Sequence, residues 1–160
     1  MNLENVLVFL LGFFSCAFLF FSFGSSLEVP FNTGLAVLDE EPLSAPTDWV
    51  DQKDIIILGD KIILRISGAT LSSYADSGSM LPVLDKGANG IRIVPESEED
   101  VGVGDIVSFR IGALLVAHRI VEKGVDEDGV YFVVKGDANL ISDGKIRFED
   151  IEHVTIGVIY

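Results

Sequence analysis

A serine-containing turn and a histidine within an apolar stretch are the features of this chain whose side chains could do chemistry together. Ser77 and Ser79 flank a glycine in the segment YADSGSMLPVLDKG, residues 74–87. Ser, Gly, Asp and Pro are common turn residues, so this segment is either an ordinary surface loop or a turn that presents one hydroxyl as a nucleophile. His118 interrupts the apolar segment LLVAHRIV. A histidine that accepts the proton of a serine hydroxyl activates such a nucleophile.

Two aspartates follow His118 in the chain, and hairpin geometry brings them toward it. The turn VDEDG joins the segments LLVAHRIVEK and YFVVKGD and is centred near residue 127. Paired residue numbers in a hairpin sum to about twice the number at the turn centre, so residue 118 lies across from roughly residue 136. His118 is therefore predicted beside the corner formed by Gly136 and Asp137, and Asp143 lies on the loop that leaves this corner. A carboxylate beside a histidine orients the ring and favours the imidazolium formed during reaction.

Each of these residues also has an ordinary structural interpretation when it is considered alone. A single histidine in a strand is more often a hydrogen-bonded core residue, and single Ser and Asp residues in loops usually stabilise turns. The ordered combination of SGSM, HR, KGDAN and SDG in a β context favours a site instead. His153 begins another strand without such partners and is predicted to be structural.

Short β-rich segments after residue 54 are the elements that must position these groups. DIIILGDKIILRI predicts two strands around Gly59 and Asp60, a two-residue hairpin signal. DIVSFRI, LLVAHRIVEK, GVYFVVKGD and HVTIGVIY are further runs of β-branched and aromatic residues bounded by Gly or Asp. No stretch here has helical periodicity. Residues 54–160 are therefore predicted to form an all-β domain, either a barrel or a folded pair of sheets.

An apolar run near the N-terminus predicts a membrane anchor within residues 1–24. The run from Val6 to Phe23 has 18 residues without a charge and holds seven of the eleven phenylalanines. As a helix it would be about 27 Å long, close to the roughly 30 Å thickness of the hydrocarbon core. The alternative is a cleaved secretory signal, since small residues follow the run. The run is longer than usual for such a signal, however, and the preceding MNLEN has no Lys or Arg.

The acidic segment 25–53 is predicted to be a linker or a loosely docked strand. Asp39, Glu40 and Glu41 are interpreted as a solvated acidic run, and Trp49 either packs at the edge of the domain or lies at the membrane interface. Because the first Lys after the anchor is Lys53, the positive-inside rule does not set the orientation. Nothing in this acidic segment would retain it in the cytoplasm, so the C-terminal domain is expected on the extracytoplasmic side.

Composition excludes several classes of function. The formal charge of −14 and the pI near 4.3 argue against a nucleic-acid binder, which would need a basic surface. The single cysteine, Cys16, allows no intramolecular disulfide and no thiolate metal cluster.

Four segments taken together resemble the successive motifs of type I signal peptidases. They are SGSMLP (77–82), GDIVSFR (104–110), HRIV (118–121) and KGDANLISDG (135–144), in the order of that family and after an N-terminal apolar run. Bacterial members have a lysine base where this chain has His118, so the chain is similar to the archaeal and endoplasmic-reticulum branch, which uses Ser, His and Asp. One departure is Ala138, which replaces the first Asn of the usual GDNN.

The resemblance assigns a role to each matching residue. It implies that Ser79 is the nucleophile, His118 the general base and Asp143 the third catalytic residue. Asp137 matches the aspartate that supports the site. Ser77 matches the hydroxyl that stabilises the oxyanion together with the backbone N–H of Ser79, in agreement with the chemistry that a tight SGS turn allows.

The function expected from the resemblance is a membrane-anchored serine endopeptidase that removes signal peptides from exported preproteins. It implies small side chains at the substrate's −1 and −3 positions, a substrate paired with a strand edge, and no metal or cofactor. The expected partners are preproteins, the lipid bilayer and accessory membrane subunits, with no nucleic acid. The alternatives are an inactive homologue that acts as a membrane scaffold or binding subunit, and a self-cleaving β-domain protease.

Overall fold

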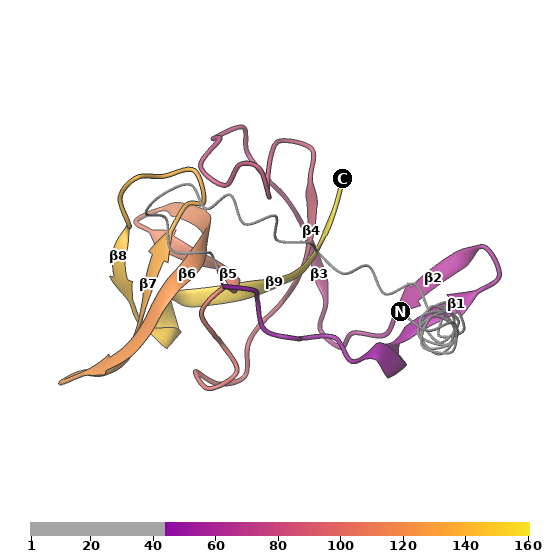
Figure 1. Cartoon of the computed structure of the whole chain (residues 1–160), viewed down its shortest axis with the longest axis horizontal. Coiled ribbons are helices and arrows are strands. Elements are labelled where there is room, and N and C mark those ends of the chain that lie inside the picture. The colour runs from indigo at the N-terminus through magenta and orange to yellow at the C-terminus, as the bar shows by residue number, and fades with distance from the viewer. Residues whose placement is uncertain (1–43) are drawn as a thin grey trace, which may run out of the picture. The chain divides into compact units, whose positions relative to one another are not determined.

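The computed structural model describes residues 44–160, which form an all-β domain, as the sequence predicts (Figure 1). The strands of this part of the chain are β1 (Ile55–Leu58), β2 (Lys61–Leu64), β3 (Thr70–Ser73), β4 (Asn89–Ile93), β5 (Ile106–Ile111), β6 (Leu114–Asp126), β7 (Gly129–Lys135), β8 (Gly144–Ile146) and β9 (Ile151–Ile159). The short 3-10 turns η1 (Gln52–Asp54) and η2 (Phe148–Asp150) are its helical elements. No helix within this range has the length and apolar character needed to span a bilayer. The predicted anchor, including Cys16, lies outside the described residues, as do Asp39, Glu40 and Glu41.

The strands form a separate hairpin and one seven-stranded antiparallel sheet. β1 and β2 pair around Gly59, whose φ of 62° is the left-handed conformation that glycine adopts without strain in a two-residue turn. The sheet has the order β3-β4-β9-β5-β6-β7-β8. In Figure 1 the β6–β7 hairpin extends in orange away from the rest of the sheet. The hairpin expected around Gly59 and the strands expected within DIVSFRI, LLVAHRIVEK, GVYFVVKGD and HVTIGVIY are confirmed.

The β6–β7 pairing has the predicted register at its site end. The first observed pair is Arg119 opposite Lys135, directly next to the predicted pair of residues 118 and 136 and in the same register. The ladder shifts by one residue between Ile120 and Glu122. The predicted pairing therefore holds between this bulge and His118, and it is off by one residue between the bulge and the turn. β3, β4 and β8 were not predicted, because TLSS, NGIRI and GKI are short and lack a run of strand-forming residues.

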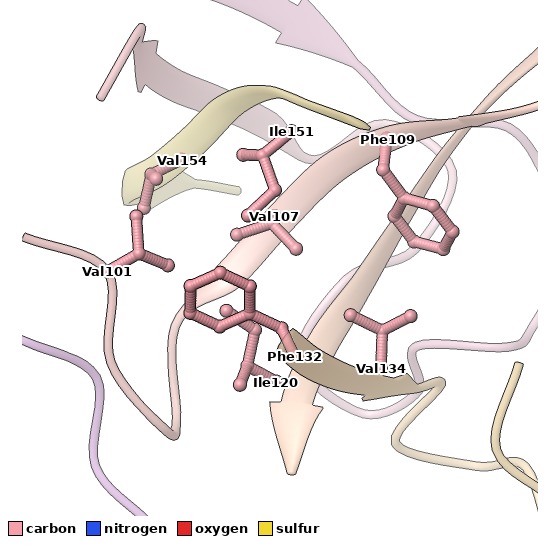
Figure 2. Close-up of a cluster of buried hydrophobic side chains, with 8 residues drawn as sticks. All are labelled: Val101, Val107, Phe109, Ile120, Phe132, Val134, Ile151 and Val154. Carbon is pink, nitrogen blue, oxygen red and sulfur yellow. The ribbon is translucent and has the colours of Figure 1, made fainter. Parts of the chain in front are cut away.

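The main hydrophobic core fills the space enclosed by the curved sheet. Val107 and Phe109 of β5 point toward Phe132 and Val134 of β7, and Figure 2 shows these side chains converging. Burial of a large apolar side chain contributes about 1.5–3 kcal/mol, so this cluster is a main source of stability. The buried members are Val101, Val107, Phe109, Ile120, Phe132, Val134, Ile151 and Val154.

The segment that precedes β1 is attached to this domain through a buried aspartate. Asp105 is fully buried and accepts hydrogen bonds from the backbone N–H of Thr47 at 2.8 Å and from the indole N–H of Trp49 at 3.2 Å. A Cβ on Gly104 would approach the carbonyl oxygen of Ala45 to 2.2 Å, so this glycine permits the close contact. Trp49 also packs against the main core. Of its two predicted positions, Trp49 therefore occupies the edge of the domain.

Candidate active site

The turn that carries Ser79 brings two hydroxyls together. Gly78 has a φ of 71°, in the left-handed region that costs a residue with a Cβ about 1–2 kcal/mol. This conformation lets the chain reverse between the two serines, and the Oγ atoms of Ser77 and Ser79 lie 3.2 Å apart. The backbone N–H of Ser79 also points at the Ser77 hydroxyl, with 3.4 Å between nitrogen and oxygen. One backbone donor and one hydroxyl donor therefore meet beside the Ser79 hydroxyl.

Residues directly after Ser79 anchor this turn in a second hydrophobic cluster. Met80 and Leu84 are buried and pack against Ile106 of β5. Both Val83 and Leu84 donate backbone hydrogen bonds of 2.9 Å to the carbonyl of Met80, which closes one helical turn. The nucleophile candidate thus lies between a flexible glycine and a firmly packed methionine, so its position is set by the core.

His118 connects Ser79 to a carboxylate. It lies on β6 opposite Val107 and is 5% exposed. Its Nδ1 is 2.5 Å from Oδ2 of Asp143, and its Nε2 is 3.0 Å from the Oγ of Ser79. An ionised carboxylate only accepts hydrogen bonds, so Nδ1 is the atom that carries the proton. The unprotonated Nε2 is then free to accept the hydroxyl proton of Ser79.

Asp143 reaches the histidine through the loop between β7 and β8. Its backbone N–H donates to the carbonyl of Val134 at 2.9 Å, one residue before the β7–β8 pairing begins with Val134 opposite Gly144. Its side chain is 20% exposed, compared with 7% for His118. The β7–β8 pairing therefore fixes the backbone of Asp143. The carboxylate of Asp143 then contacts the Nδ1 side of the His118 ring.

Asp137 does not contact His118 but binds the next residue of the strand. Its two carboxylate oxygens accept hydrogen bonds of 2.8 Å each from Nε and Nη2 of Arg119. Neighbouring residues of a strand point to opposite faces, so His118 and Arg119 reach different carboxylates. Arg119 also donates to the carbonyl of Gly104 at 2.7 Å. The β6–β7 hairpin brings both expected aspartates toward this end of β6, but Asp143 is the one that bonds to His118.

The corner formed by residues 136–139 supports the serine turn from the other side. The backbone N–H of Ala138 donates to the carbonyl of Ser79 at 2.9 Å, and a Cβ on Gly136 would approach that same oxygen to 2.6 Å. Because the bond to Ser79 comes from the backbone of residue 138, the methyl side chain of Ala138 is compatible with it. Gly136 is required by this close approach.

A cleft of about 500 Å³ opens beside Ser79 between two unpaired strand edges. Among residues 44–160, β3 is the first strand of the sheet and pairs only with β4. The first half of β6, residues 114–118, pairs with β5, whereas its pairing with β7 starts at Arg119. Both edges therefore have backbone groups available to an added extended chain. The residues around the cleft come mainly from these edges and the serine turn: Ser72, Ser73, Tyr74, Ala75, Ser77, Ser79, Met80, Leu84, Arg92, Ser108, Leu114, Leu115, Val116 and Ala117.

Two arginines belong to this region although sequence reasoning did not select them. In the sequence Arg119 is only the residue after His118. Its buried partner, Asp137, reaches it through the corner formed by residues 136–139. Arg92 lines the cleft from β4, a strand with no clear sequence signal. His153, predicted to be structural, lies on β9 opposite Ser108. Within residues 44–160, no group of three or more His, Cys, Asp or Glu is arranged to hold a metal ion.

Comparisons of the chain with protein-family models, with curated proteins and with solved structures found no match. The interpretation of the site therefore rests on its own geometry and on the motif pattern.

Proposed function

We propose that this protein is a membrane-anchored serine endopeptidase of the signal-peptidase type, with Ser79 as nucleophile and His118 as general base. The observation that carries the proposal is the continuous chain of hydrogen-bond contacts from Ser79 Oγ to His118 Nε2, 3.0 Å apart, and from His118 Nδ1 to Asp143 Oδ2, 2.5 Å apart. These three residues come from three separate segments of the chain. Their convergence has the geometry required of a nucleophile, a base and an orienting carboxylate.

The reaction follows from the donors and acceptors at this site. Ser79 Oγ attacks the carbonyl carbon of the scissile bond while its proton passes to Nε2 of His118. The backbone N–H of Ser79 and the hydroxyl of Ser77 stabilise the negative charge that develops on the carbonyl oxygen. The imidazolium then returns its proton to the leaving amine, and the C–N bond breaks to leave an acyl-enzyme. Water, deprotonated by the same histidine, attacks the ester and regenerates Ser79.

The shape of the cleft favours a polypeptide substrate in extended conformation. Residues 72–75 and 114–117 both line it, and each segment lies at or next to a strand edge that has no second partner among the described residues. An extended peptide between them satisfies these backbone groups by adding to the sheet. Such binding depends on the backbone of the substrate more than on its side chains, which suits an enzyme that accepts many preproteins.

A location at the membrane surface is supported by the apolar hairpin β1–β2. Ile57, Leu58 and Ile62 are 76%, 62% and 70% exposed. Exposed apolar patches of this kind commonly mark interaction surfaces, and a lipid interface is one environment that would cover them. The uncharged run from Val6 to Phe23 would hold the domain at that interface, where the apolar segment of a preprotein also lies. The substrate class of signal-peptide-bearing preproteins, with small side chains at −1 and −3, comes from the motif resemblance.

The test is a cleavage assay with the full chain in liposomes and a preprotein substrate. Ser79→Ala and His118→Ala should each lower turnover by about 10⁴-fold or more. Ser142→Ala is a matched control, since Ser142 is an exposed loop serine beside Asp143, and it should leave turnover unchanged. Residual activity of Ser79→Ala within about tenfold of wild type would contradict the proposed nucleophile. A wild-type protein that binds preproteins without cleaving them would instead support an inactive scaffold.

A further inference from the structure

Arg92 differs from the other arginines of residues 44–160 in having no carboxylate partner there. The remaining four each form an ion pair: Arg65 with Asp54, Arg110 with Glu152, Arg119 with Asp137, and Arg147 with Asp126 and Asp128. The Nε–H of Arg92 is buried and donates to no acceptor in the described part of the chain. A buried donor without an acceptor costs free energy, and the chain carries a formal charge of −14, so acidic partners are abundant. A guanidinium without an acceptor among residues 44–160 is available to an acceptor that this part of the chain does not supply.

Arg92 lies where a bound substrate would pass. It lines the same cleft as Ser79, together with Ser72 and Ser108. In the sheet order β4-β9-β5-β6, its strand is three strand spacings from the strand of His118. At about 4.8 Å per spacing this is about 14 Å measured across the strands, so Arg92 lies on a different part of the sheet from His118. A substrate residue away from the scissile bond is therefore the one that can reach Arg92.

The surroundings of Arg92 leave its charge available to that residue. His153 has a lowered pKa, chiefly because of burial and also because of the positive charge of Arg92. His153 therefore stays neutral at pH 7 and adds no second cation. Glu152 is the acidic group that acts on His153, and its carboxylate is bonded to Arg110. The Nδ1 of His153 is itself buried without a partner in the described residues.

We infer that Arg92 is a specificity-determining residue that binds an acidic side chain of the peptide substrate at a position away from the scissile bond. A planar guanidinium forms two parallel hydrogen bonds with a carboxylate, and the anionic side chains of a polypeptide are Asp and Glu. The inference rests on the proposed function, because it assumes that the cleft holds a peptide. It adds a charge preference at a distance from the cleavage point.

The experiment is a peptide scan with the full chain in detergent. A cleaved parent peptide is changed to Glu, Gln or Lys at each of the five positions on either side of the scissile bond, and kcat/KM is measured for each. Wild-type protein should prefer Glu over Gln by about 10- to 100-fold at one position, the effect of a hydrogen bond to a charged group. Arg92→Gln should abolish this preference, and Arg92→Glu should favour Lys at the same position. Arg110→Gln removes an ion-paired arginine that does not line the cleft and should leave the preference intact.

The outcomes separate the inference from the proposed function. If wild type cleaves all peptides with equal kcat/KM, or if Arg92→Gln retains the Glu preference, the inference is wrong while the peptidase assignment stands. If no peptide is cleaved, the proposed function fails first. The wild-type scan does not depend on the folding of any variant. Arg92→Lys keeps the charge but loses the bidentate geometry, and it should retain a weaker preference for Glu.

Discussion

Changing each of the two aspartates near His118 to asparagine should affect a different property of the protein, turnover for one and stability for the other. Asp143 bonds to His118 Nδ1, whereas Asp137 holds the side chain of Arg119. Asparagine preserves the shape of either side chain but removes its charge. We expect Asp143→Asn to abolish turnover with little loss of stability. We expect Asp137→Asn to lower stability, with a much smaller effect on turnover per folded molecule.

The size of the Asp143→Asn effect follows from the tautomer. The amide of asparagine can donate to Nδ1, and the proton of His118 then moves to Nε2, where it blocks transfer from Ser79. A wrongly set tautomer in a catalytic triad costs about 10⁴-fold in kcat. His118 with a single ring proton carries no charge, so Asp143→Asn leaves no buried charge behind. With the side chain of Asp143 20% exposed, the free energy of unfolding should fall by about 1 kcal/mol.

The Asp137→Asn effect follows from burial of its ion pair. The side chains of Asp137 and Arg119 are 2% and 8% exposed, so the change leaves a buried arginine without its counter-charge. Breaking a buried ion pair on one side costs about 3–5 kcal/mol, a large part of the 5–15 kcal/mol that stabilises a typical domain. The melting temperature should fall by about 10–25 °C.

The assay pairs thermal unfolding with turnover per folded molecule, measured on the same preparations below the lowest melting temperature. Combining Asp137→Leu with Arg119→Met removes both charges and should recover much of the stability lost in Asp137→Asn. The reasoning is refuted if Asp137→Asn has the same melting temperature as wild type. It is also refuted if both asparagine variants lose activity equally without losing stability. Either result would mean that the aspartates do not serve separate partners.

Two further predictions concern the serine turn and its support. Ser77→Ala should lower kcat by about 10²–10³-fold with little change in KM, because its hydroxyl acts on the oxyanion, and a change confined to KM would mean that it only binds substrate. Gly136→Ala should displace the serine turn and lower kcat at least tenfold, since its new Cβ would lie 2.6 Å from the Ser79 carbonyl. Gly157→Ala is its control, with ordinary contacts of 3.6 Å or more and no left-handed backbone, and equal kinetics of the two variants would contradict the close approach.

Sequence patterns determined the parts of this protein that depend on neighbours along the chain. The β1–β2 hairpin follows from two short apolar runs separated by Gly59 and Asp60. The register of β6 and β7 follows from the position of their turn, which predicts His118 beside residue 136, and the observed pair of Arg119 and Lys135 agrees with it. These predictions succeed because a hairpin is closed locally and its side-chain period is fixed.

Tertiary structure decided which groups meet across larger separations. Ser79 is 39 residues from His118, and only the packing of Met80 and Leu84 and the support of the 136–139 corner bring the two together. Strand alternation directs Arg119 rather than His118 to Asp137, and the predicted hairpin register alone does not distinguish which residue pairs with which aspartate. β3 and β4 become strands through pairing in the sheet, since their short segments have little β preference of their own. Arg92 reaches the cleft only through this pairing, because strand order is set by burial of the whole sheet and not by the residues adjacent in the chain.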